Sequence, residues 1–186
     1  MKIRSLSMFN YTFRAPGSRV EGPVRFAVGQ VTLGMLLIGR SQRGICAVLL
    51  GDDAQTLRDE LAETFPNAEL LLDQASLQRE LDQVIAFIDK DTTAGAINLD
   101  IGGTAFEQRV WRTLCGIPAG QTRSYSEVAR DLGTPKAARA VAGACAANVL
   151  AIAIPCHRVV RGDGSVSGYR WGAERKLALL AKERSQ

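Results

Sequence analysis

Residues 124–148 read SYSEVARDLGTPKAARAVAGACAAN, and this stretch predicts two short helices joined by a tight turn. A Ser-x-x-Glu capping box opens the first helix at Ser124, and Gly133 ends it. Thr134 is expected to cap the second helix, with Pro135 at its first helical position. Two short helices around a turn that contains glycine and proline are typical of a helix-turn-helix.

The second helix of this pair has almost no side-chain bulk, because most of its residues up to Asn148 are alanine or glycine. A helix that reads the major groove carries long polar side chains, whereas a slim helix brings its backbone close to a narrow groove. Lys136, Ala138 and Arg139 are therefore the candidate DNA contacts, and Arg139 is long enough to enter the base stack. The alternative is that the small residues serve tight packing inside the protein.

The stretch IPCHRVV at residues 154–160 places Cys156 beside His157, the only histidine of the sequence. A cysteine nucleophile reacts as its thiolate, and a free cysteine is mostly protonated at neutral pH. A neighbouring imidazole can take up that proton, so Cys156 is the candidate nucleophile. An enzyme that acts on a base takes it out of the stack, and a DNA-facing helix shortly before a reactive cysteine suits that task. The alternative is an inert, buried packing cysteine.

The composition is that of a globular protein, with 46% hydrophobic and 23% charged residues among 186. The four cysteines form no C-x-x-C pair and only one histidine accompanies them, so we expect no metal and no cofactor. The longest apolar run, between Asn148 and Pro155, is too short to span a bilayer. The first residues lack the apolar core of a secretory signal. We therefore expect a cytoplasmic protein with free thiols and no membrane partner.

The net charge of +4 conceals an asymmetry between the two halves of the chain. Residues 1–104 carry 10 Lys and Arg against 13 Asp and Glu, which gives −3, whereas residues 105–186 carry 13 against 6, which gives +7. A basic half favours a polyanionic partner, with nucleic acid the first candidate. The alternative is that a modest basic excess only aids solubility.

The N-terminal half predicts an α/β arrangement. Strands are expected at residues 24–28, 33–38, 45–50 and 68–72, a strand or an extended linker at 97–101, and amphipathic helices at 54–65 and 77–88. The strands at 33–38 and 45–50 flank a short polar segment and predict a hairpin, and Asp52 or Asp53 is expected to cap the first helix. Residues 1–22 show no period and predict a loose tail or a linker remnant, and residues 92–95 predict a loop.

The character of the sequence changes to short helices from Gly102 onward. A capping box at Thr104 opens one of them, and the last helix is expected at 173–183 with Leu177 and Leu180 facing inward. The expected organisation is therefore a tail over residues 1–22, an α/β domain over 23–101 and a helical domain over 102–186.

Together these segments resemble the O6-alkylguanine-DNA alkyltransferases, single-use repair proteins. The resemblance rests on Pro155-Cys-His-Arg-Val159, on Asn148 and on the segments around Tyr125 and Arg139. It runs through most of the chain and is strongest in the C-terminal half. It implies a ribonuclease-H-like N-terminal α/β domain, with a small antiparallel sheet and helices. A mainly α domain with a winged helix-turn-helix is expected to follow it.

The segment RGDGSVSGYRW at residues 161–171 is most similar to the methyl-accepting C-terminal half of the bacterial adaptive-response regulator. The N-terminal zinc-binding and DNA-binding portions of that regulator are not in this sequence. A natural stand-alone protein and a fragment of a longer one therefore both stay open.

The resemblance assigns a role to each matching residue of the reaction centre. Cys156 would accept the alkyl group, and His157 would relay its proton through a water to Glu183. Asn148 would brace the turn that holds the cysteine, and Tyr125 would contact the flipped nucleotide and protonate the leaving guanine. These roles suit a displacement at carbon, which needs a thiolate and a donor near the leaving oxygen.

The resemblance also implies how the substrate is held. Lys176 would be an electrostatic helper, and Arg139 would fill the gap left by the flipped base. The carbonyls of Cys156 and Val159 would accept hydrogen bonds from the guanine amine. The expected pocket residues are Pro155, Val159, Ser167, Tyr169, Arg170 and Trp171. Trp171 is expected to form one wall and to favour methyl over bulky alkyl groups, unless it packs behind that wall.

The implied function is the stoichiometric and irreversible transfer of an alkyl group, mainly methyl, from O6-alkylguanine in duplex DNA to Cys156. The protein would act as a monomer, and O4-methylthymine stays open as a second substrate. Three alternatives need other features. A cysteine hydrolase needs a histidine across a cleft and an oxyanion hole. A damage-binding protein without chemistry would lack the cysteine, and a winged-helix regulator would have no use for the Cys-His pair.

Overall fold

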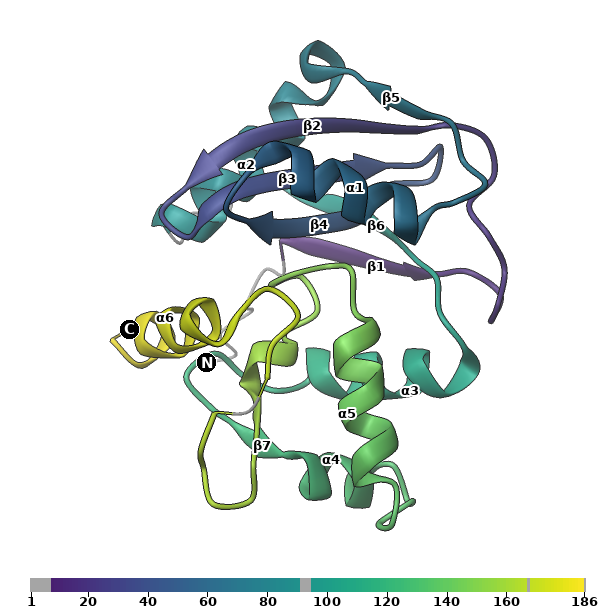
Figure 1. The fold of residues 1–186 in the computed structure, drawn as a ribbon. Helices are drawn as coiled ribbons and strands as arrows, with labels where there is room; N and C mark the ends of the chain where they lie inside the picture. Colours follow the sequence, from purple (N-terminus) through teal and green to yellow (C-terminus); the bar gives the residue numbers. More distant parts are fainter. Residues whose placement is uncertain (1–7, 91–94, 167, 186) are drawn as a thin grey trace. The chain divides into compact units, whose positions relative to one another are not determined.

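The computed structural model describes residues 8–90, 95–166 and 168–185. The chain divides into two compact units, Met1–Gly102 and Gly103–Gln186 (Figure 1). Unit 1 is built on a sheet, and unit 2 is mainly helical. Among the described residues, no helix combines the length and the apolar character that a membrane span requires.

Unit 1 contains a six-stranded sheet in the order β1-β6-β4-β3-β2-β5. The strands are β1 (Phe9–Phe13), β2 (Val24–Val31), β3 (Gly34–Arg40), β4 (Ile45–Gly51), β5 (Leu70–Leu72) and β6 (Ile97–Ile101). The three central strands are antiparallel, including the predicted hairpin β3–β4. The pairs β1–β6, β4–β6 and β2–β5 are parallel. The sheet is thus mixed, and the expectation of an antiparallel sheet is wrong for the strands that follow helical crossovers.

The expected loose tail over residues 1–22 is wrong for Phe9–Phe13, which form the edge strand β1. All five residues pair with β6, from Phe9 opposite Ile97 to Phe13 opposite Ile101. Phe9 is buried and packs edge-on against Phe87 at a ring distance of 5.5 Å. The partner strand lies far along the sequence, so the local pattern contains no sign of this pairing.

Two helices cover the sheet of unit 1, with α1 (Ala54–Thr64) on β3 and β4 and α2 (Gln74–Lys90) on β2 (Figure 1). The expected N-cap is present, because the Asp53 carboxylate accepts a hydrogen bond from the Thr56 amide at 2.8 Å. Consecutive residues of β3 and β4 are buried, as expected for strands covered on both faces. Of the predicted loop at 92–95, residues 92–94 lie outside the described residues.

Unit 2 contains α3 (Ala105–Cys115), α4 (Tyr125–Asp131), α5 (Ala138–Ala147), the 3-10 turn η1 (Cys156–Arg158) and α6 (Ala173–Arg184). A two-stranded parallel pair joins β7 (Arg123–Ser124) to β8 (Val159–Val160). The predicted capping boxes at Thr104 and Ser124 are both formed. The Trp111 indole donates to the Ala144 carbonyl at 2.8 Å and ties α3 to α5.

The turn between α4 and α5 differs from the prediction, because α5 begins at Ala138 and Thr134 does not cap it. Gly133 has a positive φ of 72°, and its amide donates to the Arg130 carbonyl at 2.9 Å. The amide of Thr134 donates to the Ala129 carbonyl, also at 2.9 Å. These two bonds form a Schellman motif. Thr134 therefore terminates α4 instead of starting α5.

The inner face of α6 also differs from the prediction, because Leu177 is 53% exposed. Lys176, Leu179 and Leu180 are the buried residues of this helix. They follow the i, i+3, i+4 spacing of one helix face. The prediction failed because a buried lysine occupies a position of that face where a leucine was expected.

Candidate functional site

The turn that follows α5 holds Cys156 through the side chain of Asn148. Asn148 is buried, and its oxygen accepts a hydrogen bond from the Leu150 amide at 2.9 Å. Its Nδ2 group donates to the Ile154 carbonyl at 3.0 Å and lies 3.2 Å from Cys156 Sγ. One amide side chain therefore bonds to the backbone of the turn and contacts the sulfur.

The same turn contains backbone strain at Ile152, whose φ is 69°. Within residues 8–90, 95–166 and 168–185 it is the one residue other than glycine with positive φ. A β-branched residue is a genuine outlier in that region, where non-glycine residues pay roughly 1–2 kcal/mol. A strained turn persists only where its surroundings fix it. The hydrogen bonds of Asn148 supply that fixation.

Cys156 is 3% exposed, and its sulfur lies near groups that favour the thiolate but do not offset the effect of burial. Burial raises the pKa of Cys156 to about 11, although the Asn148 amide, Lys176 and Arg170 favour the thiolate. The resting sulfur is therefore a thiol at neutral pH, and a reaction at it requires removal of the proton.

A histidine and a carboxylate stand beside this cysteine. His157 is fully buried, and its Nε2 lies 2.8 Å from Glu183 Oε1. The two are in direct contact, so the expectation of a water between them is wrong. The other ring nitrogen, Nδ1, is buried and has no hydrogen-bond partner among the described residues.

The two groups titrate below their usual ranges. Burial lowers the pKa of His157, against the opposing effect of Glu183, so the imidazole is neutral at pH 7. Burial alone would raise the pKa of Glu183, but hydrogen bonds from His157 and Arg158 outweigh it and lower that pKa to about 2. The pair is therefore a neutral base held by an ionised carboxylate.

These shifts predict that the protein loses stability as the pH falls. The unfolded chain binds a proton on histidine below about pH 6.5, whereas folded His157 resists it, so stability is present above that pH and is lost below it. Only one histidine titrates there, so urea unfolding between pH 7.5 and 5.5 should show a slope of up to about 1.4 kcal/mol per pH unit. His157→Gln should flatten that slope, and an equally steep slope in the variant would contradict the assignment. The contribution of Glu183 is lost further down, between its ordinary pKa of 4.5 and about 2.

Lys176 brings a buried amine to the site. It is 1% exposed, and its Nζ donates to the Val159 carbonyl at 2.6 Å. The same Nζ lies 6.0 Å from the ring centre of Tyr125. Burial lowers the pKa of Lys176, while the nearby sulfurs of Cys156 and Cys145 raise it.

A pocket of about 400 Å³ opens onto Cys156. Its walls come from α4, α5, η1 and the segment before α6, and they consist of Tyr125, Ala142, Cys145, Ala146, Cys156, Gly168, Tyr169 and Arg170. The sequence prediction missed Ala142, Cys145, Ala146 and Gly168. The first three follow helical spacing on α5 and could have been found from that periodicity.

Three of the predicted pocket residues do not line this pocket. Pro155 and Val159 are buried, and Val159 presents its carbonyl to Lys176. The expectation that Trp171 forms a wall is wrong, because Trp171 is buried behind Tyr169, with the two rings 5.2 Å apart and edge-on. Ser167 lies outside the described residues.

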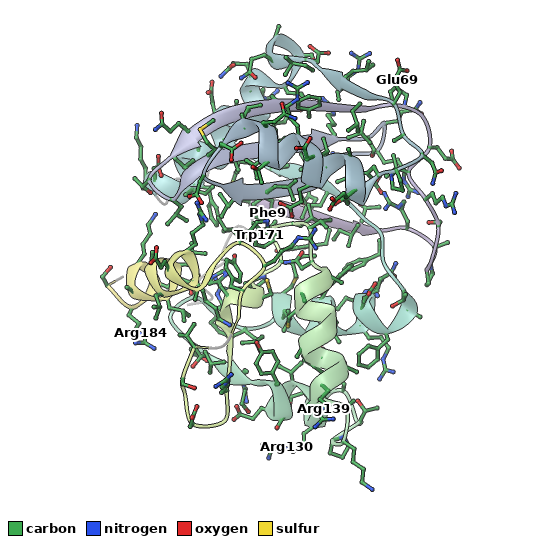
Figure 2. All side chains as sticks on the ribbon, viewed as in Figure 1. Phe9, Glu69, Arg130, Arg139, Trp171 and Arg184 are labelled. Carbon is green, nitrogen blue, oxygen red and sulfur yellow. The ribbon has the colours of Figure 1, made fainter. Side chains whose placement is uncertain are left out.

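The predicted DNA contacts lie at one end of α5. Lys136 is exposed in the turn before the helix, and Ala138 is the first helical residue. Arg139 is exposed, and its side chain makes no hydrogen bond with the described residues. In the view of Figure 2, Arg139 and Arg130 of α4 both lie at the lower end of unit 2.

Comparisons with known proteins agree with this arrangement. Residues 105–185 match the family model of the 6-O-methylguanine DNA methyltransferase DNA-binding domain. The bifunctional transcriptional activator and DNA repair enzyme Ada of Escherichia coli is 50% identical over 179 residues, which are 96% of this chain and 50% of Ada. The chain thus spans about half the length of that relative.

Smaller relatives and solved structures match over more of their own length. The inducible methylated-DNA–protein-cysteine methyltransferase of Bacillus subtilis is 33% identical, over 86% of this chain and 84% of its own. The crystal structure of Mycobacterium tuberculosis OGT in complex with DNA has a TM-score of 0.73 and 34% identity, over 87% of this chain and 94% of that chain.

Proposed function

Because this chain belongs to the methylated-DNA–protein-cysteine methyltransferase family, we propose that it repairs alkylated DNA by direct transfer. The transferred group is an alkyl group, mainly methyl, and it moves from O6-alkylguanine in duplex DNA to Cys156. The observation that carries the proposal is the placement of Cys156 Sγ at the pocket, 3.2 Å from Asn148 Nδ2 and next to the His157–Glu183 pair.

The first step of the proposed reaction removes the thiol proton. The neutral imidazole of His157 is the base, and its unpartnered Nδ1 supports a water that bridges it to Cys156. Proton transfer through one water is within the reach of a general base. The imidazolium that forms is then stabilised by Glu183 at 2.8 Å.

The second step is displacement at the alkyl carbon. The Cys156 sulfur forms a bond to that carbon while the bond from carbon to guanine O6 breaks. The electron pair goes to the guanine, which takes a proton from Tyr125 at the pocket wall. Return of the thiol proton through the site to Tyr125 balances the reaction. A thioether is a poor leaving group, so the protein is consumed in a single turnover.

The proposed substrate is a nucleotide flipped out of duplex DNA into the pocket. In this proposal Lys136 and Ala138 contact the backbone of DNA, and Arg139 occupies the gap in the stack. The basic C-terminal half, with a net charge of +7, supports phosphate contacts with little sequence preference. Trp171 does not line the pocket, but it packs against Tyr169, which does.

We also propose one finer assignment of the fold for each unit. The antiparallel centre and parallel flanks of the sheet support a ribonuclease-H-like unit 1. The Schellman turn between α4 and α5 and the β7–β8 pair support a winged helix-turn-helix in unit 2.

The test is incubation with a duplex oligonucleotide that contains one O6-methylguanine, followed by mass spectrometry of the intact protein. We expect the mass of one methyl group per protein chain and no further gain with excess DNA. Peptide mapping should locate the group on Cys156. Repeated turnover, or no gain of mass, would contradict the proposal.

A further inference from the structure

The carboxylate of Glu183 is held by more groups than the proposed reaction needs. The Arg158 guanidinium contacts it three times: Nε lies 3.1 Å from both oxygens, and Nη2 lies 2.8 Å from Oε1. The Gly120 amide donates to Oε2 at 3.2 Å, and His157 contacts Oε1 at 2.8 Å. The side chains of Arg158 and Glu183 are 16% and 12% exposed, so solvent competes little for these bonds.

The Arg158 guanidinium is also held by a backbone carbonyl group. Its Nη1 donates to the Ile117 carbonyl at 2.6 Å. The residue therefore joins η1, which holds Cys156, to the loop after α3 and to the end of α6. A planar guanidinium with donors in a fork restrains a carboxylate in one orientation, which an ammonium group cannot do.

We infer that Arg158 is the positioning residue of the proton relay, holding Glu183 as an anion against His157 so that the proton leaving Cys156 is held on His157, and not on Glu183, until it returns to Tyr125. The inference rests on the proposed function. In this step the sulfur–hydrogen bond breaks and a nitrogen–hydrogen bond forms on the imidazole. Glu183 takes up no proton, because all the donors around it favour the carboxylate.

Two possible roles of Arg158 have opposite effects on His157. As a nearby positive charge, Arg158 makes protonation of the imidazole harder. As the group that holds Glu183 in place, it preserves the contact that makes protonation easier. Removal of Arg158 therefore raises the titration midpoint of His157 in the first case and lowers it in the second. The sign of the shift separates the two roles.

The experiment is NMR titration of the imidazole, which reports on one residue because His157 is the only histidine. In Arg158→Met the midpoint should move to lower pH, in the same direction as in Glu183→Gln. A move to higher pH, or no move, would overturn the inference. Arg161→Met is the matched control, because Arg161 is exposed and its side chain makes no hydrogen bond with the described residues. Its midpoint should equal that of the parent.

A second variant keeps the test decisive if Arg158→Met does not fold. Arg158→Lys retains the charge but not the fork, so it removes only the positioning role and should also lower the midpoint. Its single-turnover methyl transfer should slow about tenfold, a fraction of the roughly 10²–10⁴-fold that a positioned base contributes. An unchanged midpoint and rate in Arg158→Lys would overturn the inference.

The proposed function can fail separately from this inference. The imidazole titration needs no alkylated DNA and gives a result even if the parent protein accepts no methyl group. A parent that gains no methyl group contradicts the proposed function. A parent that gains it, with an unshifted titration in both Arg158 variants, contradicts the role of Arg158 alone.

Discussion

Cys156→Ala is expected to abolish alkyl transfer while leaving affinity for duplex DNA within about twofold of the parent. The sulfur is the group that forms the new bond, and no other atom at this position can replace it. The side chain is buried and small, so its loss leaves the end of α5 that carries Arg139 unchanged. The measurement is the mass of the intact protein after incubation with methylated duplex, beside a binding titration.

Cys145→Ala is the matched control, because Cys145 lines the same pocket. Burial and, to a lesser extent, nearby Cys156 raise the pKa of Cys145 to about 12, so this thiol ionises even less readily than Cys156. It also lacks the amide that Asn148 directs at the Cys156 sulfur. The control should accept one methyl group. Methyl on Cys145 in the Cys156→Ala variant would contradict the assignment of the acceptor.

Much of the fold is determined by signals that act over a few residues, and these were predicted correctly. The capping boxes at Thr104 and Ser124 and the Asp53 cap are local hydrogen bonds, and all three are present. The hairpin β3–β4 follows from two apolar runs around a short polar segment, and the structure contains it. These features depend on neighbouring residues, so the sequence pattern is enough.

Two of the failures arose where a partner far along the sequence decides the structure, and one arose in the turn that ends α4. Strand β1 forms because it pairs with β6, which lies at the other end of the unit 1 sequence. Thr134 bonds back to Ala129 because Gly133 adopts a positive φ, which ends α4 before a new helix can start. Lys176 is buried because the Val159 carbonyl accepts its amine. None of these partners follows from local periodicity.

The candidate site shows the same division. The resemblance identified Cys156, His157 and Glu183 as site residues, but it did not predict the contacts that hold the Glu183 carboxylate. Arg158 was not predicted, although it stands beside His157 in the sequence, because its importance lies in a bidentate contact with α6. The position of Trp171 behind Tyr169 likewise depends on packing between side chains.

Arg139→Ala is expected to slow repair of methylated duplex DNA tenfold to a hundredfold while leaving reaction with free O6-methylguanine unchanged. Arg139 is exposed at the start of the slim helix α5, and it makes no hydrogen bond with the described residues that would hold it back. Flipping a base costs a few kcal/mol. A side chain that fills the gap offsets part of that cost, and about 1.4 kcal/mol corresponds to a tenfold change in rate.

Single-turnover rates at saturating duplex separate this role from simple binding. Arg130→Ala is the matched control, because Arg130 is also exposed at this end of unit 2 (Figure 2). It should weaken binding and reduce its dependence on salt, since it removes one cation available to phosphate. Its rate at saturation should stay close to that of the parent, because it does not enter the stack. If Arg139→Ala slows the duplex and the free base equally, Arg139 supports the pocket and has no part in extruding the base.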